Sequence, residues 1–243
     1  MTVLKYITDI LFSIRTTIWS LWFLIAMLLA GAVVMPAKEE FQTIHSMPLF
    51  DWLSEQSFII TWWLWASIAV LILLALNTLL CSVQSVLKKR GVSNLLLILS
   101  PQIIHAAFLL MLLAHLLSSS GGFKEIIAAG EGAAFQLNKD GVVLVIERIE
   151  ISADPAGYMS DWGVDIVYTS GGKQIKRDRI MPNRPSLYED FNINVKDLRA
   201  FPQKAALVQI SREPGALWAL AGGVLFMLGI MTLVILRVKT SRD

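Results

Sequence analysis

One apolar stretch constrains the fold more than any other part of the sequence. Residues 95–117 are mostly apolar, and between Gln102 and Ser118 there is no Asp, Glu, Lys or Arg. At about 1.5 Å per residue, a helix of this length crosses the roughly 30 Å hydrocarbon layer of a membrane. The stretch is therefore predicted to be a transmembrane helix, and it carries two histidines, His105 and His115.

A histidine inside a membrane commonly has one of three uses. It hydrogen-bonds to a neighbouring helix, it relays protons, or it ligates a metal such as haem iron. His105 lies deep in the apolar run, whereas His115 lies near its end beside Ser118. A spacing of ten residues separates the two by about 15 Å along a helix and by roughly 80° around it. One haem therefore cannot be held by both.

The composition excludes several function classes. With 55% hydrophobic residues and a mean hydropathy of +0.61, the chain is too apolar for an ordinary soluble domain. Its single cysteine, Cys81, excludes an internal disulfide, a Cys-x-x-Cys redox site and covalently attached haem. The net charge of +2 comes from basic residues beside apolar stretches, which gives no reason to expect nucleic-acid binding.

Four membrane spans are predicted, and they divide the chain. The first three, within residues 1–120, lie at about 16–35, 58–87 and 101–118, and the fourth, within 214–243, lies at about 216–236. The first is longer than the apolar core of a signal peptide, so it is predicted to be retained. Residues 94–99 are predicted as an interfacial helix that Pro101 kinks into the membrane.

Charges beside these spans predict their orientation. The loop at residues 37–57 is acidic and holds the third histidine, His45, while basic residues follow spans two and four at 88–90 and at 237–242. By the positive-inside rule, both termini are predicted to lie in the cytoplasm of a bacterial inner-membrane protein, with the acidic loop outside.

Residues 121–213 have a different character. Alternating runs bounded by turn residues predict strands at 133–137, 142–151, 163–169, 174–181 and 205–212. Gly171-Gly172 predicts a hairpin between the third and fourth of these strands. The fold class is thus four transmembrane helices with an extracytoplasmic antiparallel β domain inserted between helices three and four. Gly222, Gly223 and Gly229 in the fourth span predict close helix packing.

The order of several short motifs resembles the ResB/CcsB family, the membrane subunit of the system II machinery for cytochrome c biogenesis. No single motif is specific, and their order and spacing carry the resemblance. The motifs are Arg15-Thr16-Thr17 with an exit at residues 31–36, Trp62-Trp63, Leu76-Asn77, His105 to Phe123, Gly130-Glu131-Gly132, Tyr158 to Asp161, Met181 to Pro185, and Ile210 to Gly215. The chain departs from longer members in its much shorter soluble domain.

The resemblance implies a function in haem handling. It implies that the chain and a CcsA-type partner conduct haem across the membrane and present it to apocytochrome c. It also implies that His105 is an axial ligand to the iron of haem b, with the opposing ligand from the partner; His115 is a weaker candidate. Bond formation is then expected on the partner, so this chain alone is not expected to be an enzyme. Whether a thioredoxin-like reductant is a further partner stays open.

Glu131 and Asp161 match the family only by local pattern. They are candidates for contact with the partner or the substrate, and stabilisation of a turn or a strand end is the alternative.

Two other functions stay open. The chain is a membrane b-type cytochrome if His115 and His45 form a ligand pair near the outer surface. It is a cofactor-free anchor or assembly subunit if both membrane histidines are only hydrogen-bonded.

Overall fold

The computed structural model describes residues 12–88, 95–137, 141–153, 159–200 and 202–240. The chain divides into two compact units. The first comprises the chain up to Ile44, Pro48–Ser120 and the chain from Pro214 onward; the second comprises His45–Met47 and Gly121–Glu213.

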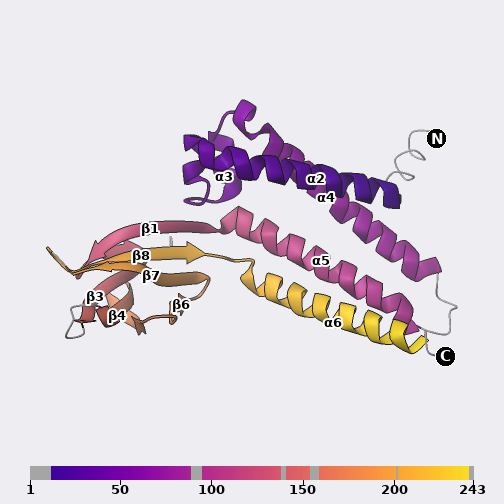
Figure 1. Ribbon diagram of the computed structural model, residues 1–243. Helices are drawn as coiled ribbons and strands as arrows, with labels where there is room; N and C mark the ends of the chain where they lie inside the picture. The colour runs from indigo at the N-terminus through magenta and orange to yellow at the C-terminus, as the bar shows by residue number, and fades with distance from the viewer. Residues whose placement is uncertain (1–11, 89–94, 138–140, 154–158, 201, 241–243) are drawn as a thin grey trace. The chain divides into compact units, whose positions relative to one another are not determined.

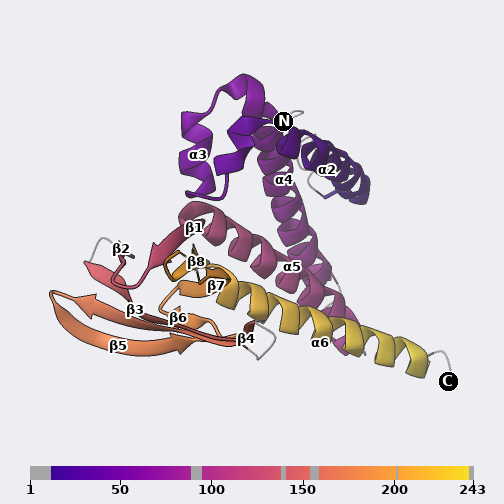
Figure 2. The same ribbon diagram turned by 60° about the vertical axis from the view of Figure 1, so that its left-hand side comes forward.

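Among the described residues, the first unit contains four long helices, which Figures 1 and 2 show. They are α2 (Ile14–Val34), α4 (Phe58–Lys88), α5 (Leu95–Gly121) and α6 (Ala216–Thr240). All four are long and apolar enough to cross a membrane, by length and composition. Antiparallel sheets lie between α5 and α6 in the chain, so the predicted architecture of four spans with a β insertion is confirmed. The extracytoplasmic side of the β domain stays a prediction.

The predicted interfacial residues belong to the same helix as the span. Residues 95–99 are the first residues of α5, and Pro101 lies inside that helix. A proline removes one backbone hydrogen bond, but membrane helices tolerate it where neighbouring groups satisfy the freed carbonyl. Asn94, the first residue of the predicted helix, lies outside the described residues.

The connection between α2 and α4 is folded onto the end of α4. It contains η1 (Met35–Ala37), η2 (Glu39–Thr43) and α3 (Leu49–Glu55). The Phe41 ring lies 5.3 Å from the ring of Trp52 and 6.0 Å from that of Trp63, and Trp52 is fully buried. Trp52 Nε1 donates to Thr43 Oγ1 at 3.2 Å. Aromatic rings with a satisfied N–H thus anchor this connection.

Small residues let α6 lie against α5, which Figures 1 and 2 both show side by side. A Cβ at Gly229 would lie 2.7 Å from Ile104 Cγ1, and a Cβ at Gly222 would lie 3.0 Å from Met111 Cγ. Gly223 has nothing within 4 Å. The predicted role in close helix packing is therefore confirmed for two of the three glycines.

The second unit is built from two four-stranded antiparallel sheets. Their strand orders are β1-β8-β7-β6 and β2-β3-β4-β5. The strands are β1 (Phe123–Gly130), β2 (Ala134–Gln136), β3 (Val142–Ala153), β4 (Met159–Ser170), β5 (Lys173–Ile180), β6 (Ser186–Tyr188), β7 (Phe191–Arg199) and β8 (Ala205–Arg212). Inward-facing side chains of both sheets form one apolar core, which includes Leu144, Ile166, Ile193 and Val208.

Five of these strands agree with the prediction. The predicted runs correspond to β2, β3, β4, β5 and β8, and the β4–β5 hairpin turns at Gly171 and Gly172, with φ of 56° and 76°. The sequence prediction did not include β1, β6 or β7. The turns predicted around 138–140 and 154–157 lie outside the described residues.

A buried hydrogen-bonded chain links the two sheets. Tyr168 Oη on β4 lies 2.8 Å from Ser186 Oγ on β6, and Ser186 Oγ donates to Asp178 Oδ2 at 2.7 Å. A carboxylate only accepts, so the single hydroxyl proton of Ser186 goes to Asp178 and Tyr168 must donate to Ser186. Burial raises the pKa of Tyr168 to about 12, which keeps this donor protonated.

We predict that Tyr168→Phe destabilises the protein by about 1 kcal/mol, the usual value of one such hydrogen bond. Tyr188→Phe is the matched control, because Tyr188 stacks on Tyr168 at 4.7 Å and its hydroxyl bonds to no described residue. Thermal unfolding of the full-length protein in detergent measures both. Because the phenol is harder to ionise in the folded state, stability falls as pH rises from about 10 to 12, and Tyr168→Phe removes this slope. Equal losses in both variants would contradict the prediction.

Candidate functional site

His105 makes a hydrogen bond between two spans. Its half-buried imidazole on α5 has Nδ1 2.8 Å from Ser82 Oγ on α4. Ser82 lies five residues before the end of the span that finishes at Leu87, and His105 lies six residues after the start of the span that begins at Leu99. Both are therefore about 8 to 9 Å inside their spans, at matching depth.

This contact leaves the other imidazole nitrogen available. None of the residues that the structure describes hydrogen-bonds to Nε2 of His105. A neutral imidazole that binds a metal through Nε2 carries its proton on Nδ1, and that proton needs an acceptor such as a hydroxyl oxygen. Ser82 Oγ is placed to accept it. The pair therefore suits a metal that is ligated through Nε2.

The surrounding residues suit haem iron better than a bare ion. Within the described ranges, no group of three or more His, Cys, Asp or Glu side chains could hold a metal ion. A porphyrin supplies four ligands itself and needs only axial ones from protein, so a single imidazole on one side is a sufficient contribution from this chain. A single imidazole is therefore all that this chain would need to supply if a haem bound here with its second axial ligand from elsewhere.

The other two histidines lie in different surroundings. His115 is exposed on α5. His45 belongs to the second unit, where its backbone oxygen accepts a hydrogen bond from the Lys124 backbone N–H at 2.6 Å. The b-type cytochrome hypothesis thus needs ligands from two different units.

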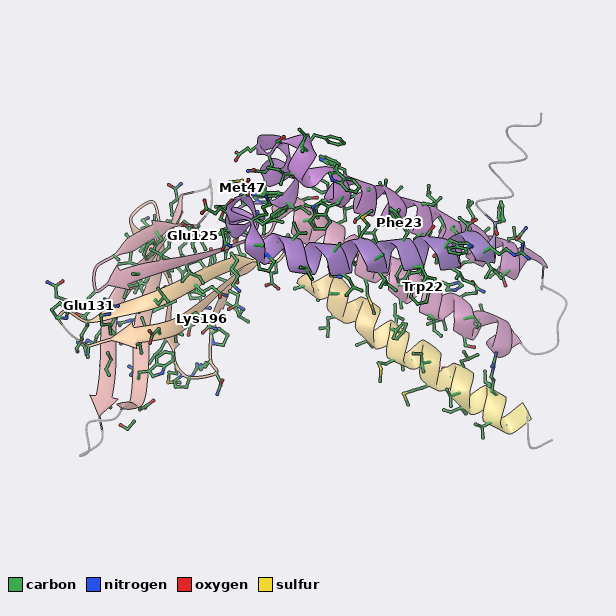
Figure 3. All side chains as sticks on the ribbon, turned by 45° about the horizontal axis from the view of Figure 1, so that its top comes forward. Trp22, Phe23, Met47, Glu125, Glu131 and Lys196 are labelled. Carbon is green, nitrogen blue, oxygen red and sulfur yellow. The ribbon has the colours of Figure 1, made fainter. Side chains whose placement is uncertain are left out.

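The Glu131 side chain accepts a hydrogen bond from a backbone N–H of β3 to which no neighbouring strand among the described residues bonds. It is exposed in the turn after β1, where Figure 3 labels it, and its Oε1 accepts from the Ile149 backbone N–H at 2.7 Å. Lys204 Nζ donates to the backbone oxygen of the same residue at 3.1 Å. The pairing of β3 shifts register between Ile146 and Arg148. Beyond this shift, the side chains of Glu131 and Lys204 bond to the backbone N–H and C=O of Ile149 at the edge of β3.

Asp161 makes a local contact. It is exposed on β4, and its Oδ1 accepts from the Trp162 backbone N–H at 2.8 Å. It pairs with Ser152 on β3, three residues beyond Ile149. Both acidic candidates thus have structural contacts inside the β unit, and their contact with a partner or substrate stays a prediction.

The β3–β4–β5 sheet also carries a ladder of opposite charges. Arg179 bonds to Glu150 at 2.5 Å and to Asp165 at 3.3 Å, and Arg177 pairs with Glu147. The hydrogen bond from Arg179 lowers the pKa of Glu150. Exposed pairs of this kind contribute little to stability, and because the charges are paired they form no single-sign surface for steering a ligand.

Sequence reasoning did not identify Ser82. A signal was present, because spans joined by a short connection are usually antiparallel neighbours. Residues at similar distances from the connection at 89–94 then lie at similar depth, as Ser82 and His105 do. The contact of Thr17 Oγ1 with Asn77 Oδ1 at 2.6 Å was also not predicted, although both residues belong to motifs quoted above.

Comparisons with known proteins give limited information. The sequence matches no protein-family model and no curated protein, so the resemblance to the ResB/CcsB family stays a prediction. Among solved structures, the chain is similar to "Cytochrome c Heme Lyase CcmF", with 17% sequence identity and a TM-score of 0.45. The match covers 69% of this chain and 30% of that chain, so this chain spans less than a third of that protein's length. At this level, the likeness does not establish a shared fold or activity.

We predict that Glu131→Ala destabilises the protein by about 1 kcal/mol, because the Ile149 N–H loses its acceptor. Glu131→Gln keeps an acceptor oxygen and costs much less. Asp161→Ala is the control, since its bond is to the adjacent residue at an exposed position. Thermal unfolding of the full-length protein measures all three. An equal loss in the Gln and Ala variants would show that the charge, and not the hydrogen bond, is what matters.

Proposed function

We propose that this protein is the membrane subunit of a cytochrome c maturation complex, in which it conducts haem across a bacterial inner membrane and presents it for attachment to apocytochrome c. The observation that carries the proposal is the imidazole of His105 inside a span, with Nδ1 engaged by Ser82 and Nε2 available. The motif order of the ResB/CcsB family supports the same function.

In this proposal, His105 holds haem b from one side through Nε2. The bound iron porphyrin supplies the ligand-binding and redox chemistry, and the chain supplies orientation. Ser82 accepts the Nδ1 proton, which fixes the tautomer and the ring plane. The opposing ligand would come from a CcsA-type partner, as the resemblance to the ResB/CcsB family implies.

The β unit would work on the outer side of the membrane. With both termini in the cytoplasm, the insertion between α5 and α6 faces outward, where apocytochrome c is matured. There it would hold the partner or the apocytochrome, with Glu131 and Asp161 as candidate contacts. The thioether bonds would form on the partner, so this subunit contributes to the attachment complex without being catalytic alone.

The first experiment compares two substitutions of His105. Asn can keep a hydrogen bond to Ser82 but cannot ligate iron as an imidazole does, whereas Ala removes both contacts. We predict that protein purified with its partner shows a reduced b-type haem spectrum, and that His105→Asn and His105→Ala both lower haem content strongly. In the haem-free protein, only His105→Ala lowers thermal stability.

Variants of the other histidines separate the rival functions. His45→Ala and His115→Ala should leave haem content nearly unchanged. Loss of haem in both of these variants, with His105→Asn unaffected, would favour the b-type cytochrome. Haem content that is the same in all variants would favour the cofactor-free anchor.

The second prediction concerns Ser82. Removal of the group that orients a metal-ligating histidine typically lowers metal affinity 10- to 100-fold, so Ser82→Ala should weaken haem binding by about 10-fold. It should also shift the reduction potential of the bound haem, because the hydrogen bond at Nδ1 tunes the basicity of the ligating imidazole. Ser82→Thr keeps the hydroxyl and should restore both values, and Ser85→Ala on the same helix is the control. A reduction potential that does not move in Ser82→Ala would show that Ser82 does not orient the ligand.

A further inference from the structure

The first unit also contains a cavity that the proposed haem function does not use. It has a volume of about 550 Å³ and lies between α2 and α4, at the end where η1 and η2 connect them. Pockets of roughly 300 to 1,000 Å³ are typical of small-molecule sites. The lining residues are Phe23, Ala26, Met27, Ala30, Gly31, Val34, Lys38, Phe41, Ile59, Ile60, Trp62 and Trp63.

The cavity has the length of one membrane leaflet. Its α2 residues recur every three or four positions, so they lie on one face of the helix. From Phe23, labelled in Figure 3, to Val34 the face runs over eleven residues, which is about 16 Å. Half of the hydrocarbon layer is about 15 Å thick. The groove therefore matches an acyl chain that enters from the η1–η2 end.

Small residues on α2 explain why the groove exists. A Cβ at Gly31 would lie 2.5 Å from Trp63 Cη2, so the Trp63 ring packs directly against the α2 backbone. Ala26 and Ala30 are too small to fill the space beside this contact. The result is an apolar channel bounded by aromatic and branched side chains.

Lys38 lies at the end of the groove and is the one charged residue in the lining. Lys38 is exposed, and it forms no ion pair with any residue that the structure describes. Glu39 and Glu40 follow it on η2 but do not line the cavity. Trp62 and Trp63 lie at the same end, as aromatic residues do at the membrane interface. The indole N–H of Trp63 is buried and has no acceptor among the described residues.

We propose that this groove binds one glycerophospholipid, with an acyl chain along α2 and the phosphate on Lys38. An acyl chain would pack against the apolar walls, and a phosphate would pair with the Lys38 ammonium at the open end. The ester groups between them can supply an acceptor at the depth of Trp63. A helix of a partner is a poorer match, because a helix is about 10 Å wide and an apolar one brings no anion to Lys38.

The test uses the full-length protein in detergent, titrated with dioleoyl phosphatidylglycerol or with dioleoylglycerol, which has the same chains and no phosphate. Native mass spectrometry counts the bound lipids. The wild-type protein should bind one phosphatidylglycerol more tightly than dioleoylglycerol. Lys38→Gln should weaken phosphatidylglycerol binding about fivefold, the value of one lysine contact near a lipid surface, and leave dioleoylglycerol binding unchanged. Lys173→Gln, at an exposed position of β5, is the control.

A second pair of variants tests the groove itself. Ala30→Phe fills the space and should abolish binding of both lipids, whereas Ala32→Phe lies on the same helix outside the lining and should not. If Ala30→Phe fails to fold, the Lys38→Gln comparison still decides. Equal wild-type affinity for both lipids would overturn the proposal. So would a wild-type dimer, free of bound lipid, that Ala30→Phe dissociates. The test needs no haem, so it is independent of the proposed function.

Discussion

The interaction on which the helical unit depends is the hydrogen bond between helices in a medium that offers no water. A polar side chain inside hydrocarbon must find its partner within the protein. Several do so within their own helix, as Ser67 does with the Trp63 carbonyl. Among the described residues, three others form polar bridges between successive helices. These bridges are Thr17 to Asn77 between α2 and α4, Ser82 to His105 between α4 and α5, and Ser118 to the Gly215 backbone N–H where α6 begins.

The middle bridge differs from the other two in a way that matters for function. A serine or asparagine would join the helices as well as a histidine does, because one donor and one acceptor are enough. Imidazole brings a second ring nitrogen, and a polar atom without a partner is costly in an apolar medium. Within the described residues, Nε2 of His105 has no such partner. Among the described residues, packing accounts for the contact of Nδ1 only, and the proposed axial bond to iron would give Nε2 a partner as well.

The spans and one hairpin could be predicted from the sequence, but the contacts that depend on long-range pairing could not. Span positions follow from length and hydropathy, and the β4–β5 hairpin follows from Gly171 and Gly172. β7 alternates with buried Phe191, Ile193 and Val195, but two asparagines between them weakened its pattern. Ser82 was missed because its place beside His105 depends on the pairing of α4 with α5, which the short connection between them indicates only indirectly. The partner of Glu131 depends on a register shift in β3 that no local pattern indicates.

Positions along the helices show that the two proposed binding sites are separate. Trp63 in the groove and Ser82 beside His105 are 19 residues apart on α4, or about 28 Å. They therefore lie in opposite halves of the membrane, and no single ligand reaches both. His105 is also 16 residues before Gly121, where α5 ends, which is about 24 Å along the helix axis. Haem held by His105 would thus be most of a membrane thickness away from the end of α5 that precedes the β unit. Under the proposed function, attachment would then need a second haem position nearer that end, and we propose that His105 serves haem entry while the partner supplies the second position.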